Sequence, residues 1–187
     1  TMYQLGFPLG ILRRHAKKND WVLDPFCGRG TTNYAARMLQ LPSVGLDTSP
    51  VAVALASAKL PRVSPAQVIA TARQILSSKG RANTPTGRFW KLAYNRATLS
   101  DLCILRENLL RSGDSATRKV LRAIILGSLH GPLTKSVPSY FSNQSPRTYA
   151  PKPNYAVGYW TKKRLAPPPV DVLSLITRKA QHYLAVQ

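Results

Sequence analysis

The same pattern of apolar and polar residues occurs twice within the first sixty positions of the chain. Short apolar runs at 21–26 (WVLDPF) and 43–47 (SVGLD) each precede a longer segment with helical spacing, at 31–41 and 49–60. Runs of this length that end in turn residues are typical of buried parallel strands. The order strand, helix, strand, helix, with short connections, predicts the start of a parallel sheet with crossover helices. This is an α/β layout of the kind that binds nucleotides.

The pattern on either side of this unit is helical. An amphipathic helix is expected at 7–17, and further helices at 65–79, 97–111, 115–130 and 170–184. Residues 80–90 are expected to form a loop, and 131–169 are rich in Pro, Ser, Tyr and Lys. The chain is therefore expected to contain strand-helix units at 1–62, a helical region at 63–130, and a basic segment with a final helix at 131–187. His15 and His130 are expected in helices, as packing or surface residues.

The net positive charge of the chain indicates a polyanionic partner. It has 27 Lys and Arg against 7 Asp and Glu, a formal net charge of +20 and a pI near 10.8. Only seven of the basic residues precede position 61, so the excess lies in the second part. Nucleic acid is the first candidate partner, and the alternative is a basic protein without a specific site.

Cysteine usage and hydropathy bear on the compartment. Cys27 and Cys103 belong to no CxxC or Cys/His cluster, which predicts neither a metal site nor a disulfide framework. No apolar run reaches the length of a membrane span, and the N-terminus lacks the layout of a signal peptide. A reduced, cytoplasmic protein that is not bound to a membrane is the simplest interpretation.

The most informative stretch is VLDPFCGRGTT at 22–32. Gly28 and Gly30 after a strand allow a sharp turn and a close ligand, while the next helix offers free N–H groups. Asp47, at the end of the next strand, is placed to accept both hydroxyls of a ribose, although a helix N-cap is the alternative role. The loop is neither GxGxxG nor GxxxxGK[ST]. A nucleoside ligand without phosphate, whose amino group could use Asp24, fits better, and S-adenosylmethionine is such a ligand.

Two motifs resemble a known family. DPFCGRGTT followed by VGLDTSPVAVALASAKL is similar to the S-adenosylmethionine-binding region of the amino-group DNA methyltransferases, which make N6-methyladenine or N4-methylcytosine. FPLGILRRHAKKNDWVL looks like the helix that precedes this region in members with permuted motif order and lines the methionine end of the cofactor. The resemblance is specific over residues 5–60 and looser over SYFSNQSPRTYAPKPNY.

The resemblance implies a set of cofactor-binding residues. It puts the DPFxGxG residues around the methionine moiety, two threonines at the end of the loop, an aspartate on the ribose, and a Ser-Pro pair near the adenine. In the same order, these are Asp24, Pro25, Phe26, Gly28 and Gly30, then Thr31 and Thr32, then Asp47, and finally Ser49 and Pro50. Cys27 occupies a variable place in the motif and is interpreted as a small packed residue rather than a nucleophile.

The family's catalytic tetrapeptide, [D/N/S]-P-P-[Y/F/W], does not occur in this sequence. Its nearest strings, APPPV at 166–170 and VPSY at 137–140, lack the required order, so no catalytic residue is assigned. Two strands also leave a parallel sheet incomplete. We expect an incomplete Rossmann-like methyltransferase fold joined to a mainly helical and loop-rich basic region. The chain is either a fragment or the cofactor-binding subunit of a split enzyme. We favour the subunit because the chain ends after a complete helix.

The basic second part would then face DNA. Cations for phosphates lie beside aromatic rings for bases in the last third of the chain, which is a combination suited to nucleic acid. The residues assigned to this surface are Arg147, Tyr149, Lys152, Tyr159, Trp160, Lys162, Lys163 and Arg164. Two other functions stay open: a non-catalytic nucleic-acid-binding protein with a methyltransferase-like half, and an RNA methyltransferase component.

Overall fold

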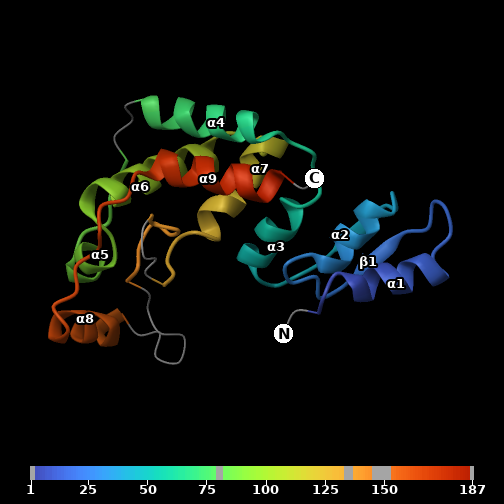
Figure 1. Ribbon diagram of the computed structural model, residues 1–187, viewed down its shortest axis with the longest axis horizontal. Coiled ribbons are helices and arrows are strands. Elements are labelled where there is room, and N and C mark those ends of the chain that lie inside the picture. The colour runs from blue at the N-terminus through green and yellow to red at the C-terminus, as the bar shows by residue number, and fades with distance from the viewer. Residues whose placement is uncertain (1–2, 79–81, 133–136, 145–152, 186–187) are drawn as a thin grey trace. The chain divides into compact units, whose positions relative to one another are not determined.

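The computed structural model describes residues 3–78, 82–132, 137–144 and 153–185 (Figure 1). The chain divides into two compact units, Thr1–Arg62 and Val63–Gln187. The first unit contains both strands of the described chain, and the second is built from helices and their connections. The mixed α/β composition is confirmed, but helices dominate it.

The first unit is a two-stranded parallel sheet with helices. Its elements are α1 (Gly6–His15), β1 (Val22–Asp24), α2 (Thr31–Met38), β2 (Ser43–Gly45) and α3 (Pro50–Ser57). The strands pair in parallel with Leu23 opposite Val44. Helix α2 packs against both strands, and α1 and α3 pack against α2. The predicted order of strands and helices is confirmed, and each strand has three residues.

Local sequence explains where α3 begins. The side chain of Ser49 accepts a hydrogen bond from the N–H of Ala52 at 3.4 Å, and Pro50 occupies the first helical position. A serine cap satisfies one of the free N–H groups at a helix start, and proline loses nothing there because its missing N–H would have no partner. The predicted start of this helix is therefore confirmed.

The second unit is helical. Its elements are α4 (Pro65–Ser77), α5 (Arg88–Ala93), α6 (Arg96–Arg111), α7 (Ala116–Leu126), α8 (Pro153–Lys162) and α9 (Val172–Leu184). Helices α4, α6, α7 and α9 pack together (Figure 1). The side chains of Leu105, Leu121, Leu175 and Ile176, which belong to three of these helices, are fully buried. Helix α8 packs against α5. Large aliphatic side chains thus make a conventional core for this unit.

A polar tie joins the start of α6 to the chain before α9. The buried Thr98 hydroxyl donates a hydrogen bond to the carbonyl of Val170 at 3.0 Å. The same hydroxyl accepts a hydrogen bond from the N–H of Val170 at 3.1 Å. A buried backbone N–H and C=O without partners would cost free energy, and this hydroxyl satisfies both. Residues far apart in sequence, in the predicted helical region and the predicted final segment, are thereby packed in one unit.

Three expectations for this unit were wrong. Residues 88–90, expected in a loop, begin α5, and α8 lies within the Pro-rich stretch where no helix was expected. Both stretches are rich in turn and loop residues, so the sequence pattern did not predict their short helices. The two helices pack against each other. His130 lies outside any helix, because α7 ends at Leu126 and Gly127 caps it.

The helices that the structure describes are all too short or too polar to cross a bilayer.

Candidate functional site

The site begins with a tight turn between β1 and α2. The N–H of Gly30 donates to the carbonyl of Cys27 at 2.7 Å, and the N–H of Cys27 donates to the carbonyl of Leu46 at 2.8 Å. The turn is therefore tied to the residue that follows β2. Gly28 and Gly30 have φ angles of 49° and 71°, the left-handed region that glycine adopts most readily.

The two glycines have different surroundings. A Cβ on Gly30 would lie 2.7 Å from the Cβ of Ala56, so this glycine is required for close packing of the loop on α3. A Cβ on Gly28 would meet no atom within 4 Å. Both were expected to make room for a ligand, but only Gly28 has open space beside it. At Gly30 the space is filled by the protein itself.

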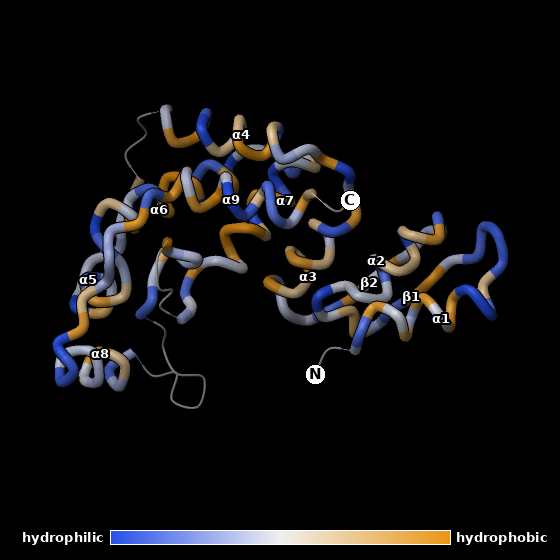
Figure 2. The backbone as a smooth tube through the Cα atoms, in the orientation of Figure 1, coloured by the Kyte–Doolittle hydropathy of each residue, from blue (hydrophilic) through white to orange (hydrophobic). Residues whose placement is uncertain are grey.

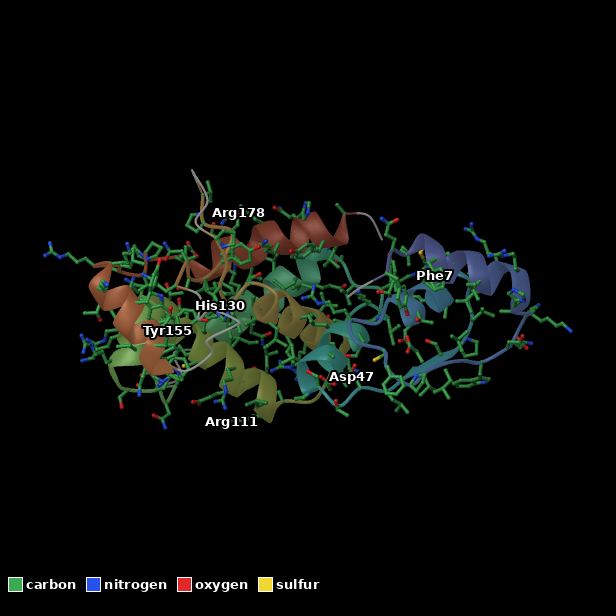
Figure 3. All side chains as sticks on the ribbon, turned by 90° about the horizontal axis from the view of Figure 1, so that it is seen from below. Phe7, Asp47, Arg111, His130, Tyr155 and Arg178 are labelled. Atoms are coloured by element: carbon green, nitrogen blue, oxygen red, sulfur yellow. The ribbon has the colours of Figure 1, made fainter. Side chains whose placement is uncertain are left out.

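Asp47 braces this loop against the start of α3 (Figure 3). One carboxylate oxygen accepts from the N–H of Gly28 at 2.9 Å, and the other accepts from the N–H of Ser49 at 2.8 Å. Helix α3 takes its cap from Ser49, so Asp47 is not its N-cap. An ionised carboxylate has about four acceptor positions, which leaves capacity for hydroxyl donors of a ligand.

Asp24 carries an unpartnered oxygen. Its Oδ1 accepts from the N–H of Phe26 at 3.1 Å, whereas its Oδ2 is buried and has no hydrogen-bond partner within the described structure. A buried carboxylate oxygen without a donor is costly, because it loses water and gains nothing in exchange. The strand end therefore offers an acceptor that a ligand N–H group could satisfy.

Cys27 lies between the two acids and is buried, which confirms that it is a packed residue. Burial raises the pKa of its thiol, and the charges of Asp47 and Asp24 raise it further. The thiolate is the reactive form of cysteine, so these surroundings keep Cys27 unreactive. The hydrogen bonds from Phe26 to Asp24 and from Gly28 to Asp47 place both carboxylates at the turn.

The neighbouring side chains of the motif are more exposed. Phe26 is 87% exposed, and Pro25 is exposed beside it. Thr31 and Thr32 form the first turn of α2, and the hydroxyls of Thr32 and Tyr3 lie 2.5 Å apart. Since an exposed Phe26 contributes little to packing, it is free to cover a ligand.

An apolar hollow of about 230 Å³ opens next to Thr32. It lies where α1 meets the start of α2 and is lined by Tyr3, Phe7, Pro8, Ile11, Leu12 and Thr32. The rings of Tyr3 and Phe7 meet edge to face, with centroids 5.6 Å apart, and Figure 3 labels Phe7 on α1. The contribution of Tyr3 was not predicted. Its spacing of four from Phe7, with two aromatic rings on one side of a helix start, is the signal that could have indicated it.

The predicted DNA-facing residues have divergent surroundings. Arg147, Tyr149 and Lys152 lie outside the described residues. Lys162, Lys163 and Arg164 are exposed at the end of α8, and Tyr159 is partly buried.

The burial of Trp160 contradicts the DNA-facing role that was predicted for it. Trp160 is only 2% exposed, and its ring lies against Phe89 with centroids 5.6 Å apart. The expectation that this ring stacks on a base is wrong for this arrangement, because its hydrophobic surface is used to hold α8 on α5.

Comparison with protein families gives a match over part of the chain. No curated protein and no solved structure matches the chain. Residues 6–58 match the model of the N6/N4 methyltransferase family, described as DNA methylase. The matched segment includes β1, the glycine turn, Asp47 and α3, so it contains each predicted cofactor-binding residue. This part of the chain is therefore similar to the DNA methylases.

Proposed function

We propose that residues 1–62 bind S-adenosylmethionine as the cofactor-binding part of a DNA amino-methyltransferase. When bound, this cofactor would supply an activated methyl group on its sulfonium sulfur. The family match over 6–58 supports methyl transfer to DNA, and the site chemistry supports the cofactor. The proposal rests chiefly on the buried, unpartnered Oδ2 of Asp24, one strand away from the carboxylate of Asp47.

The residues present fit the groups of this cofactor. Asp24 would accept an N–H of the α-amino group, which removes the cost of its unpartnered oxygen. Asp47, already oriented by the N–H groups of Gly28 and Ser49, would accept the ribose hydroxyls with its remaining lone pairs. Gly28 leaves the space that the ligand needs, and Phe26 would cover an apolar part of it.

The chemical step would require residues beyond those of this sequence, and we propose that a second polypeptide supplies them. The sequence contains no polar-Pro-Pro-aromatic tetrapeptide to hold the target amino group. One face of the sheet also exposes large apolar side chains, at 72% for Trp21, 64% for Leu23, 41% for Val44 and 55% for Leu46. A face of this kind is unusual in an isolated sheet, because parallel sheets are normally covered on both sides. We propose that the partner covers this face, extends the sheet and supplies the catalytic loop.

Cofactor binding is tested by cross-linking radiolabelled S-adenosylmethionine with ultraviolet light to the chain in complex with its partner, because we expect the chain alone to bind the cofactor weakly or not at all. Asp24→Asn and Asp47→Ala should each reduce labelling at least tenfold, because each removes an acceptor for a ligand donor. Asp20→Asn is the matched control, since Asp20 lies in the same unit and accepts a local backbone hydrogen bond from Lys17. Equal labelling of all four proteins would overturn the assignment. Circular dichroism checks that the variants keep their helical content.

Methyl transfer is tested by co-expressing the chain with the product of a neighbouring reading frame that contains the catalytic tetrapeptide. The complex should methylate duplex DNA, and the 187-residue chain alone should not. DNA methylation by the purified chain alone would refute the division between two polypeptides.

The main alternative is a non-catalytic nucleic-acid-binding protein. It is favoured by the basic second unit, which has no acid between Asp114 and Asp171. Nucleic-acid binding without any labelling by the cofactor, even with the partner present, would support it. A preference of the complex for RNA over duplex DNA as methyl acceptor would instead indicate an RNA methyltransferase component.

A further inference from the structure

We propose that α5 and α8 together form a face that binds the phosphate backbone of DNA, and that Arg88 and Lys91 belong to it. This α5–α8 face consists of Arg88, Lys91, Lys162, Lys163 and Arg164. The choice of DNA rests on the proposed function, whereas the charge and geometry of the face do not. It differs from the surface expected from sequence, because it includes α5 and excludes the ring of Trp160.

Packing fixes the two helices relative to each other. The rings of Phe89 and Trp160 lie with centroids 5.6 Å apart, and Trp160 is buried. A guanidinium N–H of Arg88 donates to the hydroxyl of Thr161 at 3.2 Å. The helices also lie side by side in Figure 1. The cations of α5 are therefore held next to the end of α8, although they are about seventy residues apart in sequence.

The five side chains are exposed cations without neighbouring acids in sequence. All five residues are exposed. Residues 82–100 and 153–170 contain no Asp or Glu. Within the described structure none of the five forms an ion pair. A group of like charges without counter-charges repels itself, and an anion bound there would relieve the repulsion.

The acids of the second unit are engaged elsewhere. Glu107 pairs with Arg111 at 3.2 Å, and Asp114 pairs with Lys119 and Arg122 at 3.7 and 3.0 Å. Asp171 accepts from the N–H of Ser174 at the start of α9.

The remaining acid, Asp101, is near Asp171. Burial raises the pKa of Asp101, and the charge of Asp171 raises it further. All four acids of the unit thus have partners or neighbours other than the five cations, so the positive charge of the α5–α8 face is not neutralised from within the described unit.

Helix stability explains only part of this cluster. Three cations lie at the C-terminal end of α8, where the negative end of the helix dipole stabilises them: Lys162 in the last turn, and Lys163 and Arg164 after it. Arg88 is the first residue of α5, where the dipole disfavours a cation. Thr161 uses one of the five N–H donors of Arg88, and the others remain able to reach a phosphate. The helix dipole of α5 therefore does not account for a cation at this position, and the remaining donors of Arg88 are available to an anion.

Nucleic acid fits this face better than a lipid surface. Binding to a membrane interface usually combines cations with apolar side chains that insert among the lipids. Here neither tryptophan of the two helices is exposed, because Trp160 is buried and Trp90 is half-buried. Exposed cations on a rigid helical support are instead suited to phosphate contacts, which are independent of base sequence.

The test compares DNA binding by two double variants with the same change of charge. Arg88→Gln/Lys91→Gln removes the α5 cations from the face. Arg73→Gln/Arg106→Gln removes two exposed cations from α4 and α6 of the same unit. Binding of the full chain to a fluorescent 20-base-pair duplex is measured by anisotropy at several salt concentrations, without cofactor.

We expect the α5 variant to bind DNA at least fivefold more weakly than the control variant. The slope of log K against log salt should also fall by about 0.9 for each phosphate that the protein no longer neutralises. Lys91→Gln alone, which removes no hydrogen bond of the described structure, should show about half of the slope change and guards against misfolding at Arg88. Equally weakened binding in the two double variants would overturn the proposal in favour of a diffuse charge effect.

Two further outcomes are decisive. Tighter binding of the chain to vesicles of phosphatidylserine and phosphatidylcholine than to DNA, abolished in the α5 variant, would identify the face as a lipid-binding surface. Because the assay contains no cofactor, failure of this proposal would leave the S-adenosylmethionine site untouched. Conversely, failure of the cross-linking experiment would leave the DNA-binding result standing.

Discussion

The two units bury very different side chains. In residues 1–62 the buried apolar residues are small, namely Cys27, Ala35, Ala36, Ala56 and Ala58, and most large apolar residues are exposed. In the second unit, leucines, isoleucines, valines and Trp160 are buried. Figure 2 shows orange, hydrophobic segments in both units, so composition does not cause the difference. The difference lies in whether another element covers the apolar residues.

The exposed residues of the first unit make the contrast concrete. In the described chain, the large apolar side chains exposed in this unit are Tyr3, Phe7, Ile11, Trp21, Leu23, Phe26, Met38, Val44, Leu46, Val51, Val53 and Leu60. The second unit exposes Leu110, Val137, Tyr155, Leu165 and Tyr183. Helices that pack on one another can complete a core locally, whereas a two-stranded parallel sheet needs cover on both faces. The first unit thus resembles part of a larger sheet structure.

The largest expected effect on the free energy of unfolding comes from truncating a core side chain of the second unit. Leu175→Ala should lower the free energy of unfolding by about 2–5 kcal/mol, because Leu175 is fully buried and its truncation leaves a cavity. Leu23→Ala in the first unit should change it by about 0.5 kcal/mol or less, since Leu23 is 64% exposed. Urea unfolding followed by circular dichroism measures both. A cost for Leu23→Ala as large as that for Leu175→Ala would break the contrast between the units.

The second prediction concerns the two glycines of the turn. Gly30→Ala should destabilise the first unit by about 2–4 kcal/mol, because it adds left-handed strain and a clash with Ala56. Gly28→Ala should cost about 1 kcal/mol, because only the strain applies. Hydrogen exchange of the amides in β1 and β2 reports the local opening of this unit. Similar exchange rates in the two variants would show that α3 does not pack on Gly30 as described.

The smallest effect is a dependence of stability on pH in the second unit. Burial lowers the pKa of His130 below its ordinary value of 6.5, and the Tyr94 hydroxyl lies 3.4 Å from its Nδ1. Below pH 6.5 the unfolded chain takes up a proton on this residue more readily than the folded chain does. The free energy of unfolding should therefore fall as the pH decreases below about 6.5. Above this pH, His130 should not change the free energy of unfolding.

His130→Gln isolates this contribution from the carboxylates that titrate at lower pH. The variant should lose less stability than the parent chain between about pH 7 and 5.5, as measured by urea unfolding. His182→Gln, at an exposed position of the same unit, is the matched control for the loss of an imidazole. Identical pH profiles for the parent chain and the His130 variant would show that His130 is not held in its neutral form.

The sequence by itself determined the local features of this protein. Two apolar runs predicted the parallel strands, Ser49-Pro50 predicted the start of α3, and Cys27 was correctly interpreted as a packed residue. These features depend on neighbours within a few positions, through hydrogen bonds of the backbone and the pattern of apolar side chains. The family match rests on the same local motifs.

Only the tertiary structure decided how distant residues share their surroundings. It gave Gly30 a packing role and left Gly28 beside open space, and it linked Asp47 to both the glycine turn and the start of α3. It also buried Trp160 against Phe89 and so brought Arg88 next to the end of α8. No local pattern encodes such contacts, because the free energy of a short helix such as α5 comes mainly from the partner on which it packs.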